Sequence, residues 1–273
     1  MGGITLAVVP SATPGDSRAA LSELCGELTK LLGETCTCLH PATYGELTDA
    51  LERDRVQYAW MSPAQMVLAG ENIRLTPLLS AVRNERTDYC STLFVTAESP
   101  VRFTEQLRGK RIAWVDRTSA SGYLFVRLQL AARGIVPDDF FGGELFERSH
   151  AGVVRAVIEG RADAGATYAA RPADGAPIAR AGFLHVAPDH PMRVLEWTAT
   201  IPNDVIAGHG LLSREDHRVF GNAILTLAER EGGRKLLWNA FHAEGFVTTP
   251  RNTLKPLYDL VRLARAHGLL AHL

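Results

Sequence analysis

The stretch best suited to chemistry is a polar turn at residues 116–122, which reads Asp-Arg-Thr-Ser-Ala-Ser-Gly. A short apolar run at 112–115 precedes the turn and is typical of a strand buried in a parallel sheet. After the turn, apolar residues recur at helical spacing until Gly134, and glycine is common just past a helix end. The sequence therefore predicts a strand, a turn and the start of a helix.

The first amides of a helix have no carbonyl partners within the helix, and their dipoles favour a negative charge. Small side chains at Ser119, Ala120, Ser121 and Gly122 would let an anion reach these amides, and the two serine hydroxyls would add donors. The predicted chemistry is therefore the binding of an oxyanion. The same serines could instead only cap the helix, and the turn alone does not decide between the two interpretations.

Composition sets limits on the class of protein. The chain has 273 residues, 46% of them hydrophobic and 22% charged, with a net charge of −1. This size allows one large domain or two lobes. The near-neutral balance, without a basic stripe, argues against nucleic-acid binding. No apolar run approaches the roughly 20 residues that span a bilayer, so direct membrane insertion is not expected.

No motif indicates a cofactor or a metal. Walker and dinucleotide-binding glycine patterns are absent, and no Cys/His set has zinc spacing. Ser119, His150 and Asp116 could be drawn as a catalytic triad, but Ser119 lies in no nucleophile-elbow sequence. We therefore predict a protein without catalytic residues, cofactors or metal ligands.

The cysteines and the N-terminus bear on the compartment. Cys36 and Cys38 are too close in sequence for an ordinary disulfide, and Cys25 lies on the apolar face of a predicted helix, so reduced thiols are expected. A strand at 4–9 begins without a basic leader or apolar signal segment before it. As written, the sequence predicts a cytoplasmic protein; a trimmed signal peptide or lipid anchor would make it periplasmic or membrane-anchored.

Short apolar strands alternate with helices along the chain. Strands at 4–9, 36–40 and 56–60 alternate with helical patterns, and a second series of the same order begins at Lys110. This alternation predicts an α/β fold with mixed, mainly parallel sheets flanked by helices.

An internal repeat suggests two related lobes. Residues 50–59 align with residues 156–165, and the same offset places Thr43-Tyr44 against Ser149-His150. Ligands of open α/β sheets bind beyond the carboxyl ends of the strands. Two facing lobes would then place Ser11, Tyr44, the 116–122 turn and His150 around one cleft.

Several separated motifs resemble one family in the right order. Residues 116–123 resemble its D-P-x-S-T-S-G-Y loop, and Ser149-His150 with residues 156–166 resembles its S-H … A-V … G-x-x-D-A-G-A pattern. Residues 58–63 are similar to its A-W-x-G-P segment and residues 89–91 to its Y-x-S hinge. The family is that of the PhnD-like substrate-binding proteins of phosphate, phosphite and phosphonate ABC transporters, which have the two-lobed type II periplasmic-binding-protein fold.

The resemblance implies roles for individual residues. Ser119 and Ser121, with the amides around Ala120 and Gly122, would hold the oxyanion, while Tyr44, Tyr89 and His150 would donate from elsewhere in the cleft. Asp204 is a candidate contact for a cationic substituent of an organophosphonate. Ala120 stands where the family has Thr and Arg117 where it has Pro. Whether Arg117 contacts the ligand stays open.

The resemblance also implies an architecture and partners. Lobe 1 would comprise residues 1–94 and 200–273, and lobe 2 residues 95–199, with crossovers near 90–98 and 190–204. A monomer of this kind would close around phosphate, phosphite or a phosphonate by hinge motion and deliver it to an ABC permease. Two alternatives stay open: a cytoplasmic oxyanion- or metabolite-sensing module on the same fold, and an enzyme that uses the scaffold for another small molecule.

Overall fold

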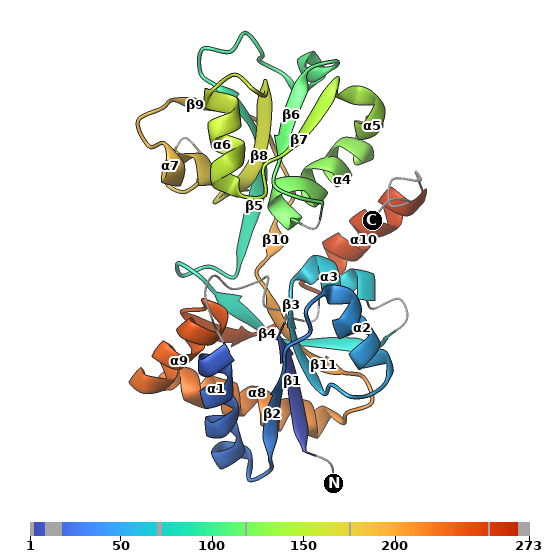
Figure 1. Cartoon of the computed structure of the whole chain (residues 1–273), viewed down its shortest axis with the longest axis vertical. Coiled ribbons are helices and arrows are strands. Elements are labelled where there is room, and N and C mark those ends of the chain that lie inside the picture. The colour runs from blue at the N-terminus through green and yellow to red at the C-terminus, as the bar shows by residue number, and fades with distance from the viewer. Residues whose placement is uncertain are drawn as a thin grey trace. The chain divides into compact units, whose positions relative to one another are not determined.

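The computed structural model describes residues 3–8, 18–69, 73–117, 119–174, 176–250 and 252–266. The chain divides into two compact units, each built from two segments of the sequence. Unit 1 comprises Met1–Thr87 and Pro202–Leu254, and unit 2 comprises Asp88–Ile201 and Lys255–Leu273. Figure 1 labels their elements.

Unit 1 contains a six-stranded sheet in the order β12-β4-β11-β3-β1-β2. Its elements are β1 (Ile4–Val8), α1 (Arg18–Leu32), β2 (Cys36–Leu39), α2 (Tyr44–Glu52), β3 (Tyr58–Met61), α3 (Pro63–Ala69), β4 (Leu75–Val82), β11 (Val205–His209), α8 (Arg214–Glu229), α9 (Glu231–Phe241) and β12 (Gly245–Thr248).

Strand residues of unit 1 alternate between two buried faces, as the pleat requires. Leu6 and Trp60 pack into the cluster that also contains residues of α1, α8 and α9. Their neighbours Ala7 and Ala59 pack into the other cluster, with residues of α2 and α3. Helices therefore cover both faces, which explains the near-continuous apolar runs in β1 and β3.

Unit 2 has a second sheet in the order β10-β5-β8-β6-β7, with β9 also paired to β5. Its elements are β5 (Asp88–Thr96), η2 (Thr104–Leu107), β6 (Arg111–Trp114), η3 (Ala120–Leu124), α4 (Phe125–Ala132), α5 (Pro137–Phe140), β7 (Gly143–Phe146), α6 (His150–Ile158), β8 (Ala164–Ala169), α7 (Gly182–Val186), β9 (Met192–Trp197) and α10 (Lys255–Ala266). The two-residue β10 (Ile201–Pro202) spans the boundary between the units.

Both sheets are mixed. Strands β2, β1 and β3 are parallel in unit 1, as are β7, β6 and β8 in unit 2. Strands β11 and β12 run antiparallel to their neighbours in unit 1, and β5 does so in unit 2. The α/β class with helices on mixed sheets is confirmed, although the antiparallel share is larger than the sequence pattern indicated.

The register of the sheets confirms the duplicated plan. In unit 1, Leu6 pairs with Cys38 on one side and Tyr58 on the other. In unit 2, Ile112 pairs with Glu144 and Ala164, which are the residues that the repeat alignment places opposite Cys38 and Tyr58. The two units therefore share strand order and strand register over these three strands.

The division of the chain differs from the predicted lobes in two respects. Strand β5 pairs along its length with β8 and β9, so all of it belongs to unit 2 and the first boundary falls at Thr87 rather than at residue 94. Helix α10 was expected in the first lobe, but it packs against α4 and belongs to unit 2. Sequence order alone does not show which apolar face an amphipathic terminal helix covers.

The cysteines also differ from expectation. Cys25 of α1 and Cys38 of β2 form a disulfide with a Cα–Cα distance of 6.3 Å, whereas Cys36 and Cys90 are free and buried. The apolar face of α1 packs onto β2, and this contact brings the two thiols within bridging distance. The expectation of four reduced thiols was therefore wrong.

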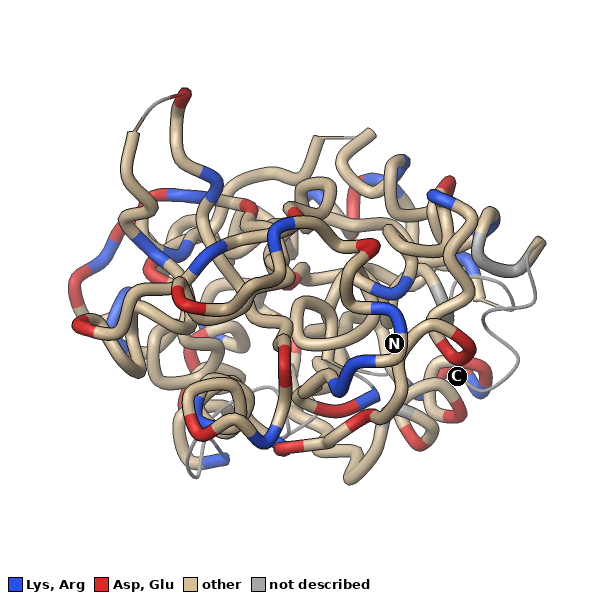
Figure 2. Tube along the Cα trace, turned by 90° about the horizontal axis from the view of Figure 1, so that it is seen from above, with Lys and Arg blue, Asp and Glu red and all other residues tan. Residues whose placement is uncertain are grey.

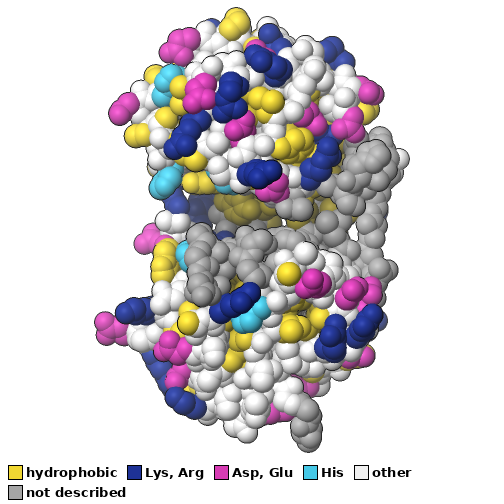
Figure 3. Space-filling model, viewed as in Figure 1, with side chains coloured by type: hydrophobic (Ala, Val, Ile, Leu, Met, Phe, Trp, Pro, Cys, Tyr) yellow, Lys and Arg dark blue, Asp and Glu magenta, His cyan; other side chains and the backbone are white. Residues whose placement is uncertain are grey.

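Charged residues of both signs are interspersed. Figure 2 shows Lys and Arg mixed with Asp and Glu along the traced chain, and Figure 3 shows both signs scattered over the face it presents. Among the described helices, none is long and apolar enough to cross a bilayer.

Candidate functional site

Residues 119–122 follow β6 and begin a helix whose first turn is a π-helix. Ser119 caps this turn, because its Oγ accepts a hydrogen bond from the amide of Gly122 at 3.1 Å. Its carbonyl accepts from Leu124 N at 3.0 Å, five residues on. The amides of Ala120 and Ser121 stand at the very start of the helix, where no preceding helical carbonyl can accept from them. Capping leaves the hydrogen of the Ser119 hydroxyl available as a donor.

Gly122 is needed for the shape of this turn. A Cβ at Gly122 would lie 2.3 Å from Val115 Cγ2 and 2.7 Å from Ser119 Oγ. The carbonyl of Gly122 also accepts from Val115 N at 3.2 Å, which folds the turn back onto the end of β6. Only a residue without a side chain allows this close approach.

A second strand fixes the peptide between Ser121 and Gly122. The Ser91 hydroxyl of β5 donates to the carbonyl of Ser121 at 2.5 Å, and both residues are buried. Because Ser119 accepts from the amide of the same peptide, that peptide is held at both ends. The orientation of the turn is therefore set by β5 as well as by its own cap.

His150 is the first residue of α6. Ser149 caps that helix by accepting from Gly152 N at 3.0 Å. The imidazole Nδ1 lies 3.0 Å from Thr167 Oγ1 of β8, and the ring packs edge-on against Tyr168 with centroids 4.9 Å apart. The side chain is thus held by the adjacent strand.

The environment of His150 disfavours its protonated form. Burial lowers the pKa of the imidazole from 6.5 to about 4, and the nearby carboxylate of Asp116 opposes this shift without reversing it. His150 is therefore neutral at pH 7. A neutral imidazole can donate one hydrogen bond to an anion without adding charge to the site.

These residues lie at one edge of the sheet of unit 2. The 119–122 segment follows β6 and His150 follows β7, and these strands are parallel neighbours. The two exits are linked by hydrogen bonds from Glu147 N to Trp114 O at 2.9 Å and from Arg148 N to Val115 O at 2.8 Å. Ligands of open α/β sheets bind at this end of the strands.

Tyr89 lies near the same edge. It precedes Cys90, which pairs with Ala169 at the carboxyl end of β8. Side chains two residues apart on a strand share a face, so Tyr89 and Ser91 face the same way, and Ser91 reaches the turn. The backbone of unit 2 therefore brings Tyr89, residues 119–122 and His150 to one region.

The remaining predicted residues belong to unit 1. Tyr44 is the first residue of α2, which Thr43 caps by accepting from Glu46 N at 3.2 Å. Ser11 lies outside the described residues. Asp204 accepts from Arg83 Nη2 at 2.7 Å, so in this structure its carboxylate takes part in an internal ion pair. A contact from Asp204 to a cationic substituent stays a prediction.

Arg117 packs against aromatic side chains. Its Nη1 donates to the hydroxyl of Tyr123 at 3.2 Å, and its guanidinium lies 5.1 Å from the centroid of the Phe146 ring. Arg127 lies 4.9 Å from the centroid of the Tyr123 ring. Cation–π contacts and a hydrogen bond therefore fix the side chain that stands in place of the family's proline.

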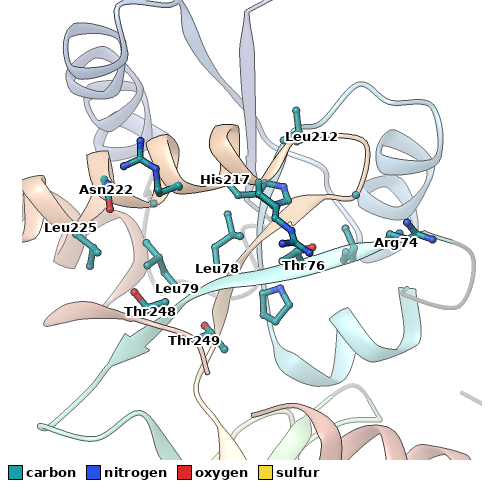
Figure 4. A pocket seen from close by; sticks show the side chains of 16 residues that line it. Arg74, Thr76, Leu78, Leu79, Leu212, His217, Asn222, Leu225, Thr248 and Thr249 are labelled. Carbon is teal, nitrogen blue, oxygen red and sulfur yellow. The ribbon is translucent and has the colours of Figure 1, made fainter. Parts of the chain in front are cut away.

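A separate cavity in unit 1 has a volume of about 780 Å³ and lies between α8 and strands β4 and β12. Figure 4 shows Leu78 and Leu79 at its centre, with Asn222 on one side and Thr248 on the other. Arginines also line it, but none of the residues predicted to bind the anion does. We therefore place the candidate site in unit 2 rather than in this cavity.

Sequence reasoning missed Ser91 as a support of the turn and Thr167 as the partner of His150. Both are fully buried polar residues in otherwise apolar or small-residue strands. A hydroxyl in such a strand must find a partner, and this was the available signal.

Solved structures of other proteins share this fold. XAC2383 from Xanthomonas citri, solved bound to ATP, superposes with a TM-score of 0.76 and 21% identity, covering 97% of this chain and 98% of that one. PhnD1 from Prochlorococcus marinus, solved with methylphosphonate, gives a TM-score of 0.65 and 15% identity, with 97% and 98% covered. The architecture is that of the type II periplasmic binding proteins.

Sequence relatives narrow this class. Residues 6–253 match the family described as the periplasmic substrate-binding protein of the phosphonate ABC transporter. The phosphate-import protein PhnD of Mycolicibacterium smegmatis is 26% identical over 178 residues, which cover 60% of this chain and 54% of that protein. The chain thus spans about half the length of this curated relative. It belongs to the family of phosphonate ABC-transporter substrate-binding proteins.

Proposed function

We propose that this protein binds a small tetrahedral oxyanion, namely phosphate, phosphite or a phosphonate, as the substrate-binding component of an ABC transporter. The observation that carries the proposal is the turn at residues 119–122. It combines the first amides of a helix, a cap whose hydroxyl hydrogen remains available and a glycine that lets the backbone approach closely. Helix starts of this form favour bound anions.

The donors in this region are neutral. They comprise backbone amides, the hydroxyls of Ser119 and Ser121, and the uncharged imidazole of His150. A hydrogen bond to a charged group is worth roughly 1.5–3 kcal/mol, so a few such donors suffice for tight binding of an anion. Tyr89 is a further proposed donor. Ser11, Tyr44 and Asp204 remain predictions.

The hydrogen bonds favour binding over catalysis. A serine nucleophile needs a histidine within hydrogen-bond reach. His150 Nδ1 contacts Thr167, and Ser119 Oγ accepts from a backbone amide. These contacts support a non-catalytic role, and a monomer that delivers its ligand to a membrane permease fits that role.

Ligand identity can be tested by thermal shift. The panel comprises phosphate, phosphite, sulfate, methylphosphonate and aminoethylphosphonate, with ATP added because XAC2383 was solved bound to it. A ligand at 100 times its Kd stabilises the folded state by about 2.7 kcal/mol, and the melting temperature should rise accordingly. We expect a phosphorus oxyanion to give the largest rise.

The site is tested by the double variant Ser119→Ala and Ser121→Ala. Because one lost hydrogen bond to an anion costs on the order of 1.5 kcal/mol, calorimetry should show affinity for the best ligand reduced at least tenfold. Ser213→Ala is the matched control, since Ser213 caps α8 by accepting from Asp216 N at 3.1 Å. It removes a helix cap far along the chain from the turn. Unchanged affinity in the double variant would contradict the proposed site.

A further inference from the structure

Thr167 is a buried polar residue for which the proposed function has no role. It lies in the middle of β8 and is fully buried, with a relative exposure of 0%. Its backbone carbonyl accepts from the hydroxyl of Thr92 at 3.2 Å, while its own hydroxyl oxygen lies 3.0 Å from His150 Nδ1. The side chain thus points away from the ladder and toward the imidazole.

The hydrogen of this hydroxyl needs an acceptor. Among the hydrogen bonds of the described residues, that to His150 Nδ1 is the only one that Thr167 Oγ1 makes. If Nδ1 carried the hydrogen, the imidazole would donate to the threonine, and a fully buried O–H would have nothing to donate to. Buried donors are almost always satisfied, so the hydroxyl donates and Nδ1 accepts. The imidazole hydrogen is then on Nε2.

The surroundings keep this contact in place. A Cβ at Gly182 would lie 2.0 Å from Thr167 Oγ1, so the glycine leaves the space that the hydroxyl occupies. On the other side, the ring of Tyr168 packs edge-on against the imidazole. Neither partner can turn away without displacing a packed neighbour.

We propose that Thr167 is a positioning residue of the oxyanion site. Its hydroxyl holds His150 in the tautomer with hydrogen on Nε2, and this makes the imidazole a neutral donor to the anion. The inference rests on the proposed function in one respect, that His150 contacts the ligand. The tautomer itself does not depend on any ligand.

The tautomer is measured first, on the full chain labelled with ¹⁵N at pH 7. Long-range ¹H–¹⁵N correlations distinguish a protonated ring nitrogen from an unprotonated one, and the spectrum of His150→Gln identifies the His150 signals by their loss. We expect Nε2 protonated and Nδ1 unprotonated. A protonated Nδ1 in the wild-type protein would overturn the inference.

Variants of Thr167 then test the consequence for binding. Thr167→Val keeps the shape and removes the hydroxyl, whereas Thr167→Ser keeps the hydroxyl. We expect Thr167→Val to mix the two tautomers and to weaken methylphosphonate binding at least fivefold, and Thr167→Ser to stay within twofold of wild type. If Thr167→Val fails to fold, Thr167→Ala takes its place.

The outcomes separate this inference from the proposed function. A Thr167→Val protein with wild-type tautomer, or with altered tautomer and wild-type affinity, would overturn the positioning role. If the wild-type protein binds none of the panel, the proposed function fails and the role in binding fails with it. The Nε2–H assignment would then still be decided by the spectrum alone.

Discussion

Because the imidazole of His150 is buried and neutral, the free energy of unfolding should fall when the pH is lowered. Burial lowers the pKa of this imidazole from 6.5 to about 4 in the folded protein, with the Asp116 carboxylate acting in the opposite direction. In the unfolded chain the imidazole regains its ordinary pKa. Between these two values the unfolded chain binds a proton that the folded protein does not.

The direction and size of the effect follow from this difference. Above pH 6.5 both states are neutral and nothing is lost. As the pH falls below 6.5, protonation favours the unfolded chain, so the free energy of unfolding decreases until the folded imidazole also titrates near pH 4. With ~1.4 kcal/mol for each pKa unit, the loss is about 2 kcal/mol at pH 5 and about 3 kcal/mol at pH 4.

Urea unfolding of wild type and His150→Gln at several values of pH measures this contribution. Glutamine does not titrate, so the wild type should lose about 3 kcal/mol more than the variant between pH 7 and pH 4. The exposed His185 supplies a control substitution of the same kind, His185→Gln. If the stabilities of wild type and His150→Gln run parallel over this range, the imidazole is not buried in its neutral form and the reasoning is refuted.

Two further predictions concern stability. Gly122→Ala should destabilise the protein by roughly 1–3 kcal/mol and weaken anion binding, because its methyl group would collide with Val115. The control is Gly26→Ala in α1, where the new methyl group meets no atom within 4 Å, so the substitution should be neutral or stabilising. Chemical denaturation compares the stabilities of the two variants, and calorimetry compares their anion affinities. Replacing both Cys25 and Cys38 by serine should lower the free energy of unfolding by about 2–4 kcal/mol. An equal loss when the wild type is treated with reductant would attribute this cost to the disulfide. A change near zero would contradict a contribution of the disulfide to stability.

The elements nearest the candidate site could be predicted because each has a local signal. Small polar residues before an apolar helical pattern marked the start of η3, and Ser149 marked the start of α6. In both cases a serine caps the helix by accepting from an amide three residues on. Such signals depend on contacts within one turn, which sequence patterns record well.

Long-range pairing was harder to predict. Strand β4 was missed, and Pro77 within it argues against a strand when only the pattern is considered. The structure accommodates this proline opposite Ala207, where the register of β11 shifts. The disulfide and the placement of α10 were missed because each depends on which elements pack together, α1 on β2 and α10 on α4, and the sequence pattern does not show this.

The duplication extends to individual hydrogen bonds. Thr5 N donates to the Gln57 side chain at 2.9 Å in unit 1, and Arg111 N donates to the Asp163 side chain at 2.9 Å at the aligned place in unit 2. The caps of α2 and α6 correspond in the same way, through Thr43 and Ser149.

These bonds fix the starts of strands and helices, and in each of them a polar side chain accepts from a backbone amide. In each unit the cap residue, not the first helical residue, accepts from the helix amide. That position is occupied by Tyr44 in unit 1 and by His150 in unit 2. The repeated frame therefore carries a different residue at the same helix start in each unit. In unit 2 this residue is the proposed donor to the anion, and Thr167 holds its ring.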